Sequence, residues 1–261
     1  MSLGNIDRLG YRTTQGGYSV NDPFMYLIVG KSFGQIYGYG YEGTWKTSEA
    51  KQAADYGELP GDRKFTDVNN DGVINKQDLK VIGNAFPDFI FGWNNRISYN
   101  NFELNFLIQG TKGNDIFNMG RIRMENPGEG TSTALLNRWT PENQNTDVPG
   151  FIDGKTREEA GLTSKILIGG DQRISRWVED GSYLRLKNIT LSYNLPKSIT
   201  DKIRLSNLRA FVSGTNLITL TKYMGYDPEV SSYNANDAQI GVDFSNYPQA
   251  KIVNFGLNIS F

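Results

Sequence analysis

One stretch of the chain has residue types and a spacing that could hold a cation, the segment DVNNDGVINKQD from Asp67 to Asp78. An EF-hand-type loop places oxygen ligands at its first, third, fifth, seventh, ninth and twelfth positions, with glycine at the sixth. Gly72 stands at that sixth position here. The predicted ligands are Asp67, Asn69, Asp71, the carbonyl oxygen of Val73, Asn75 and Asp78. Because Ca²⁺ is a hard cation that prefers oxygen ligands, the spacing predicts a calcium-binding loop.

Two departures from the EF-hand pattern indicate a structural ion with no sensing role. Position twelve is Asp78, which is shorter than the usual Glu that closes the site with both oxygens. The preceding residues GDRKFT do not form an entering helix, and only KQDLKVIG could form one turn afterwards. A calcium sensor needs helix pairs that open, which a single loop cannot supply. The alternative without metal is an Asx turn, in which the same side chains bond to their own backbone.

The composition excludes several other kinds of chemistry. The chain has 261 residues with no Cys and no His, so thiol nucleophiles, zinc–thiolate sites and imidazole bases are excluded. No motif places two carboxylates for acid–base work, so we expect no catalytic residues and no enzyme. The net charge of −1 argues against a nucleic-acid partner, which would require a basic face.

The clearest structural pattern is a hairpin in FIFGWNNRISYNNFELNFLIQG, from Phe89 to Gly110. Apolar and polar residues alternate along both arms, which is the period of a strand with one apolar face. Asn100 and Asn101 form the predicted tight turn, since Asn tolerates positive φ. Each arm has about ten residues, the length of a tilted membrane strand.

Further strands are predicted towards the end of the sequence. Alternation returns in SYLRLKNITLSYNLP, where Leu184 and Leu186 are out of phase with the later residues, indicating a bulge near Lys187 or a strand leaving its apolar environment. LRAFVSGTNLITL and KIVNFGLNISF are the next two strands, and SFGQIYGYGYEGTWK reads as an earlier one. Such alternation fits a soluble antiparallel sheet as well as a membrane barrel. Aromatic-rich apolar rows and alternating short and long connections favour the barrel.

Three long connections separate the predicted strands, and the longest, over residues 111–182, shows no sustained period. They run from Thr47 to Phe86, from Thr111 to Gly181 and from Tyr223 to Pro248. A structureless run of this length is unusual in a compact soluble domain but ordinary in the extracellular loops of outer-membrane barrels. We therefore expect an all-β fold of antiparallel strands with long extracellular loops, the calcium-type loop (67–78) lying within one of them.

From about Gly30 onward the chain resembles the late-barrel region of SusC/RagA-type TonB-dependent transporters of Bacteroidetes. The resemblance is carried by GDRKFTDVNNDG with the following Pro-Asp and hairpin, by YLRLKNITLSYNLP, by LRAFVSGTNLITLTKYMGYDPEV and by the terminal Phe261. The matching positions are Asp62, Asp67, Asp71, Gly72, Pro87 and Asp88.

The resemblance implies that residues 1–261 are the C-terminal part of a large outer-membrane β-barrel whose plug domain is absent from the chain. It implies TonB-energised import of oligosaccharides or peptides, with a SusD-like surface lipoprotein as partner and the TonB complex engaged through the missing N-terminal part. The strands would contact outer-membrane lipid, and the loops would lie at the cell surface. With six or seven candidate strands, too few to close a wide barrel, the first and last strand would have open edges.

The sequence leaves one main alternative. A secreted soluble β-domain that binds carbohydrate and is held together by calcium would show similar strands and the same loop. That alternative predicts that residues 1–261 fold alone in water, whereas the barrel segment needs a lipid or detergent environment.

Overall fold

A computed structural model describes residues 34–125, 130–152, 154–161, 173–229 and 241–261. The chain divides into two compact units. The sheet unit contains residues 87–114, 180–229 and 246–261, and the loop unit contains the described residues among 34–86, 115–179 and 241–245. Each unit is described separately below.

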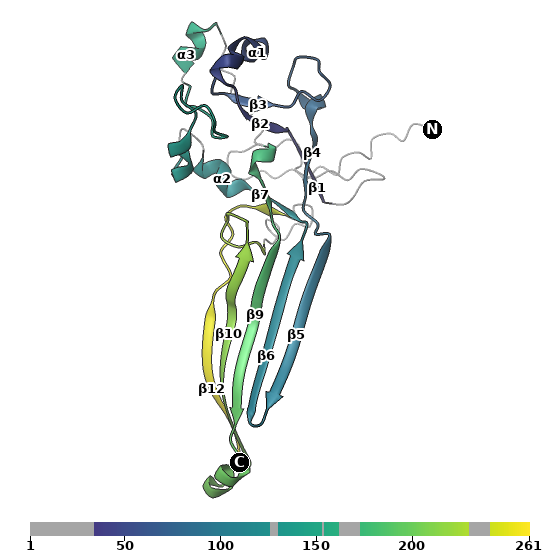
Figure 1. Ribbon diagram of the computed structural model, residues 1–261, viewed down its shortest axis with the longest axis vertical. Helices are drawn as coiled ribbons and strands as arrows, with labels where there is room; N and C mark the ends of the chain where they lie inside the picture. Colours follow the sequence, from purple (N-terminus) through teal and green to yellow (C-terminus); the bar gives the residue numbers. More distant parts are fainter. Residues whose placement is uncertain (1–33, 126–129, 153, 162–172, 230–240) are drawn as a thin grey trace, which may run out of the picture. The chain divides into compact units, whose positions relative to one another are not determined.

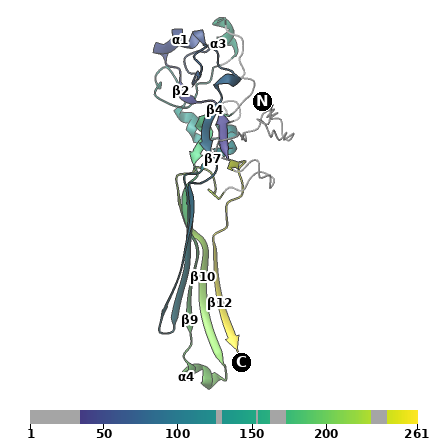
Figure 2. The same ribbon diagram turned by 90° about the vertical axis from the view of Figure 1, so that its right-hand side faces the viewer.

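The sheet unit is built on five long strands in one antiparallel layer (Figures 1 and 2). They are β5 (Phe89–Tyr99), β6 (Phe102–Lys112), β9 (Tyr183–Asn194), β10 (Asn207–Thr221) and β12 (Ile252–Ser260). Their order across the sheet is β12-β10-β9-β6-β5. Within the described residues, β5 and β12 each pair along one side only, which confirms the expected open edges.

The connections at one end of the sheet are short. Asn100, at φ 50°, turns the chain between β5 and β6, as the sequence predicts. The connection from β9 to β10 contains α4 (Lys197–Thr200) and the 3₁₀ turn η6 (Asp201–Ile203), and it lies at the same end of the sheet (Figure 1). Among the residues that the structure describes, no helix is long and apolar enough to cross a membrane.

A bulge in β9 resolves the phase change in the sequence. Asn188 pairs with Leu107 of β6, and Leu186 pairs with the next residue, Ile108, so Lys187 is the extra residue. The bulge returns Leu184 and Leu186 to the face that carries the later apolar residues of β9. The first of the two explanations offered by the sequence is therefore correct.

The loop unit contains short strands and single helical turns. Its first segment holds β1 (Gln35–Gly38), β2 (Tyr41–Thr44), η1 (Thr47–Glu49), α1 (Ala50–Asp55), β3 (Arg63–Phe65), η2 (Lys76–Asp78) and β4 (Lys80–Asn84). The others hold β7 (Asp115–Asn118), α2 (Met119–Met124), η3 (Thr133–Asn137), α3 (Gly154–Glu159), η5 (Ser175–Trp177), β8 (Val178–Asp180) and β11 (Val242–Asp243). β1 pairs with β4, β2 pairs with β3, and β7 lies between β11 and β8.

The loop unit has a hydrophobic core of its own. Its buried members are Ile36, Tyr39, Phe117, Ile122, Ile174, Trp177 and Val242. Buried charges lie beside this core: Arg176 stacks on Trp177 at 4.5 Å and pairs with Glu125 at 2.6 Å. The expectation of structureless connections is therefore wrong, because segments far apart in sequence supply one apolar cluster.

A second expectation is also corrected. The sequence SFGQIYGYGYEGTWK does not form one strand but two, β1 and β2, which pair in different sheets. The break is at Tyr39, whose backbone leaves the β1 ladder and bonds to Arg173 and Ser175 instead. Gly40 has no side chain, so Lys80 and Thr66 can approach its backbone closely.

Candidate membrane-facing surface and calcium-type loop

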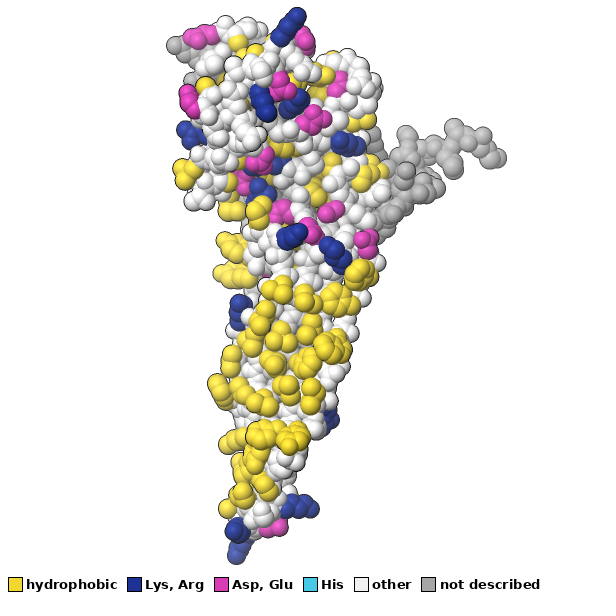
Figure 3. Space-filling model, in the orientation of Figure 1, with side chains coloured by type: hydrophobic (Ala, Val, Ile, Leu, Met, Phe, Trp, Pro, Cys, Tyr) yellow, Lys and Arg dark blue, Asp and Glu magenta, His cyan; other side chains and the backbone are white. Residues whose placement is uncertain are grey.

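One face of the five-stranded sheet is apolar across its whole width. Cross-strand pairs such as Trp93 with Ile108, Leu104 with Leu191 and Val212 with Phe255 lie in register. Figure 3 shows hydrophobic side chains gathered over the sheet. They are not covered: Trp93 is 56% exposed, Phe255 81% and Leu257 64%. A contiguous exposed apolar surface of this kind marks contact with another apolar medium.

The opposite face of the same strands is polar. Glu103 is buried and accepts hydrogen bonds from Arg209 at 3.0 Å and Asn105 at 2.9 Å, and it also pairs with Arg96. Arg209 donates a further hydrogen bond to Ser192 at 2.8 Å. Charged and polar side chains from the four neighbouring strands β10, β9, β6 and β5 are thus gathered on the side of the sheet away from the apolar rows, as in the wall of a water-filled barrel.

A second ionic cluster on the polar face anchors the segment after β10. Arg185 of β9 is 2% exposed and pairs with Asp227 at 2.7 Å and Glu229 at 2.6 Å. The bulged Lys187 also reaches Glu229, at 2.8 Å. Burial raises the pKa of both carboxyls, but hydrogen bonds and the nearby positive charges outweigh it, so the pKa of each is lowered.

The sequence analysis did not single out this cluster. Asp227 and Glu229 lie 42 and 44 residues after Arg185 in the sequence. The out-of-phase Leu184 and Leu186 were the only local signal, since the bulge that they indicate also directs Lys187 to Glu229.

In the calcium-type loop, side-chain oxygens of the first two predicted ligands meet at the backbone N–H of the third. The backbone N–H of Asp71 lies 3.3 Å from Asp67 Oδ1 and 3.1 Å from Asn69 Oδ1. Asp67 also accepts hydrogen bonds from the Gly72 amide at 2.8 Å and the Tyr56 hydroxyl at 3.2 Å. Burial raises the pKa of the Asp67 carboxyl, but these hydrogen bonds lower it by more, so the net shift is downward. The carboxyl is therefore ionised at neutral pH. Gly72 adopts φ +78° at the sharp turn.

The last three predicted ligands serve the backbone of the loop. Asn75 caps η2 by accepting from the Gln77 amide at 2.8 Å, and its side-chain amide donates to the Val73 carbonyl at 3.1 Å. Asp78 is fully buried, and its two oxygens accept from the amides of Val68 and Asn75, each at 2.8 Å.

Capping and Asx turns therefore account for the residue types in the second half of the loop. Within the described ranges, no three acidic side chains gather as a metal site. The donor set of Asp67, Asn69 and Asp71 nevertheless consists of oxygens suited to Ca²⁺, so calcium binding stays a prediction.

An antiparallel sheet with one exposed apolar face, one charged face and open edges defines this chain as part of a transmembrane-type β-barrel. No protein-family model matches the chain. It is 35% identical over 252 residues to TonB-dependent receptor P3 of Formosa agariphila, covering 94% of this chain and 24% of that protein. It is 25% identical over 214 residues to TonB-dependent receptor SusC of Bacteroides thetaiotaomicron, covering 81% of this chain and 19% of SusC.

The fold is also similar to a solved structure described as the RagAB peptide transporter. The TM-score is 0.69 at 24% identity, over 94% of this chain and 24% of the other. Over most of its length the chain is thus similar to TonB-dependent receptors, and the matches are consistent with a C-terminal segment of the SusC/RagA type. It spans about a quarter of the length of the first curated relatives that it matches. The named relatives are receptors, in keeping with the expectation that the chain is not an enzyme.

Proposed function

We propose that this chain supplies five membrane-spanning strands to the C-terminal part of the barrel of an outer-membrane importer. In the whole receptor, the TonB complex would energise the uptake of oligosaccharides or peptides, and a SusD-like lipoprotein would act at the cell surface. The apolar face would contact lipid, and the charged face would line the lumen.

The observation that carries this proposal is the exposed apolar face. Each of the five strands places large apolar side chains on that face. One example from each strand, in chain order, is Phe89, Phe102, Leu191, Ile218 and Phe255, and these five side chains are all at least 44% exposed. A secreted soluble β-domain would have to bury such a surface, because contiguous apolar patches drive association in water. Lipid removes this cost, so the barrel explains the surface and the soluble alternative does not.

The proposal for substrate and partner follows the relatives. One similar structure is described as a peptide transporter, and the curated relative SusC is a TonB-dependent receptor. In the present chain, the loop unit offers a folded surface, with exposed Phe151 and Leu136 beside polar residues. We propose that this unit faces outward and contributes contacts to substrate and to the lipoprotein.

We also propose that Ca²⁺ is a structural ion of the Asp67–Asp78 loop. The ion would join side-chain oxygens of Asp67, Asn69 and Asp71 and so stiffen an outward-facing segment; the first two already meet at the Asp71 backbone N–H. Extracellular modules bind calcium with dissociation constants of about 10⁻⁴–10⁻³ M, which suits a site with few carboxylates.

The experiment that tests the barrel proposal uses the native full-length receptor from separated membrane fractions. Boiled and unboiled samples are compared by gel electrophoresis in detergent. We expect the protein in the outer-membrane fraction, with a mobility that changes on boiling because a closed barrel resists the detergent when cold. A secreted product with one mobility would overturn the proposal and favour the soluble carbohydrate-binding domain.

A further inference from the structure

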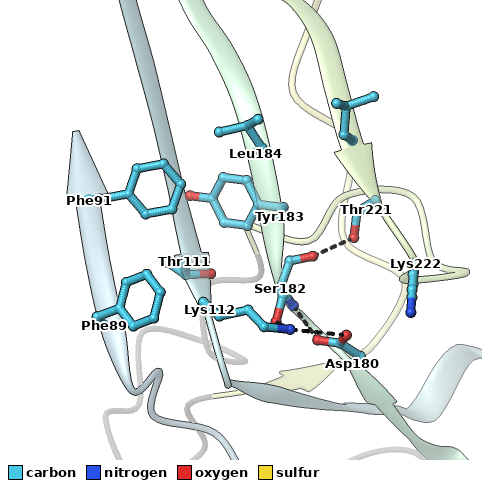
Figure 4. A pocket seen from close by; sticks show the side chains of 11 residues that line it. Phe89, Phe91, Thr111, Lys112, Asp180, Ser182, Tyr183, Leu184, Thr221 and Lys222 are labelled. Atoms are coloured by element: carbon cyan, nitrogen blue, oxygen red, sulfur yellow. Dashed lines mark hydrogen bonds and ion pairs between the residues drawn. The ribbon is translucent and has the colours of Figure 1, made fainter. Parts of the chain in front are cut away.

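A hollow lies at one end of the apolar face, within the sheet unit (Figure 4). Its volume is about 470 Å³, which is in the range of small-molecule sites. Phe89 and Phe91 of β5, Leu184 of β9 and Leu220 of β10 give it an apolar wall, and Lys112 and Lys222 stand at the strand ends. The hollow therefore combines an apolar surface with cations at the edge of the predicted lipid-facing band.

A glycine in β6 makes room for one of the aromatic rings that line the hollow. Gly110 pairs with Phe91 on one side and Leu184 on the other, in the middle of the apolar row. A Cβ at Gly110 would lie 2.7 Å from the Phe91 ring and 2.2 Å from the Tyr183 carbonyl oxygen. The missing side chain lets the Phe91 ring lean over β6, and Phe89 follows it with ring centroids 6.2 Å apart.

The cationic rim is incompletely neutralised by the protein. Lys112 Nζ lies 3.9 Å from Asp180 Oδ2 and 3.5 Å from Ser182 Oγ, and its side chain is 58% exposed. Asp180 is held in place by the Ser182 amide at 2.9 Å, and Figure 4 shows it close to Lys112 and Lys222. The lining carries two lysines and one aspartate, so its net charge is +1.

We propose that this hollow binds the phosphate-bearing headgroup of a membrane lipid, with the acyl chains lying along the phenylalanine and leucine wall. The inference rests on the proposed membrane insertion of the sheet. Lysine side chains near the ends of membrane segments extend to the headgroup level, and each contributes roughly a fivefold gain in binding to anionic lipid. A soluble anion would gain nothing from the four apolar side chains, so the lipid is the better match.

The test uses the full-length receptor purified in mild detergent and exchanged into nanodiscs of phosphatidylcholine with a minority of phosphatidylglycerol. Native mass spectrometry then counts the lipids that stay bound. We expect phosphatidylglycerol to be retained over phosphatidylcholine, and the double variant Lys112→Gln/Lys222→Gln to lower its retention by about twenty-five-fold, since two lysines each contribute roughly fivefold.

Lys251 provides the matched control. It is exposed, it lies one residue before β12, and it does not line the hollow. Lys251→Gln should leave retention unchanged. Equal loss in the Lys251 variant, full retention in the double variant, or displacement of the lipid by inorganic phosphate alone would each overturn the proposal.

A result that contradicts the lipid site can be distinguished from one that contradicts the membrane-inserted barrel. Each variant is also checked for the change of gel mobility on boiling. A protein that keeps this change without selective lipid retention contradicts only the lipid site. A wild-type protein that lacks the change contradicts the membrane-inserted sheet, and the lipid site with it.

Discussion

At the scale of residues, Arg185 is the side chain on which the polar face depends most. It is almost fully buried, and it joins the middle of the sheet to Asp227 and Glu229 beyond the end of β10. Without the arginine, two carboxylates would lose their main partner in a partly buried place. Removal of one member of a buried ion pair is strongly destabilising, because the remaining charge is left unpaired.

We therefore expect Arg185→Ala to lower the free energy of unfolding of the full-length receptor by about 3 kcal/mol. Arg96→Ala is the matched control, because Arg96 also pairs with a carboxylate on the polar face but its side chain is 68% exposed. Its loss should cost about 1 kcal/mol or less. Urea unfolding in detergent measures both. Equal effects of the two variants would contradict the special role of Arg185.

The same cluster predicts a pH dependence. The pKa values of Asp227 and Glu229 are lowered in the folded protein, so the unfolded chain binds more protons near pH 4. The stabilisation is complete above the unfolded pKa values and is lost as the pH falls through the folded ones. The midpoint temperature of thermal unfolding should therefore decrease when the pH is lowered below about 4. A double variant, Asp227→Asn/Glu229→Gln, should show a flatter profile, and an unchanged slope would contradict this cause.

The calcium-type loop is tested by changing one of its predicted ligands. We expect the full-length receptor to bind Ca²⁺ with a dissociation constant of about 10⁻⁴–10⁻³ M. Asp71→Ala should weaken binding about tenfold, since the site has few carboxylates to share the loss. Asp55→Ala, on exposed α1 outside the loop, should leave it unchanged. Isothermal titration calorimetry, after bound Ca²⁺ is removed with EGTA, measures the dissociation constant of each protein. Identical titrations for the wild type and Asp71→Ala would favour the metal-free Asx turn.

At the scale of elements, the long strands could be predicted because their period is local. Alternation placed the hairpin arms, and the structure extends the second arm only from Gly110 to Lys112. The short strands could not be predicted in this way. β1 and β2 are separated because Tyr39 pairs with a residue more than a hundred positions away, Ile174, and no local pattern carries that information.

The β5–β6 turn gives a prediction at this scale. Asn100 sits at φ 50°, where a β-branched residue is strained by about 1–2 kcal/mol relative to Asn or Gly. Asn100→Val should therefore destabilise the full-length barrel by about 1 kcal/mol, whereas Asn100→Gly should be close to neutral. Thermal unfolding, followed by the loss of the fast-migrating form on gels, measures both. A neutral Asn100→Val would show that the turn relaxes out of the left-handed region.

At the scale of the whole molecule, the sequence predicts the sheet unit far better than the loop unit. Apolar rows need only neighbours in sequence and a register set by short turns. The core of the loop unit is assembled from four separated segments around Ile36, Phe117, Trp177 and Val242. Since each contributes only one or a few buried side chains, none shows a period of its own, and the segments read as loops.

The most direct test of the central claim, that one face of this sheet contacts lipid and the other the lumen, is site-directed spin labelling of β12. The chain has no Cys, so within it a single introduced cysteine is the one residue that takes the label. In lipid bilayers, labels at Phe255 and Leu257 should collide with oxygen, and labels at Asn254 and Asn258 with a water-soluble nickel complex. This period of two is the predicted result. Equal accessibility of all four positions to the nickel complex would contradict the account.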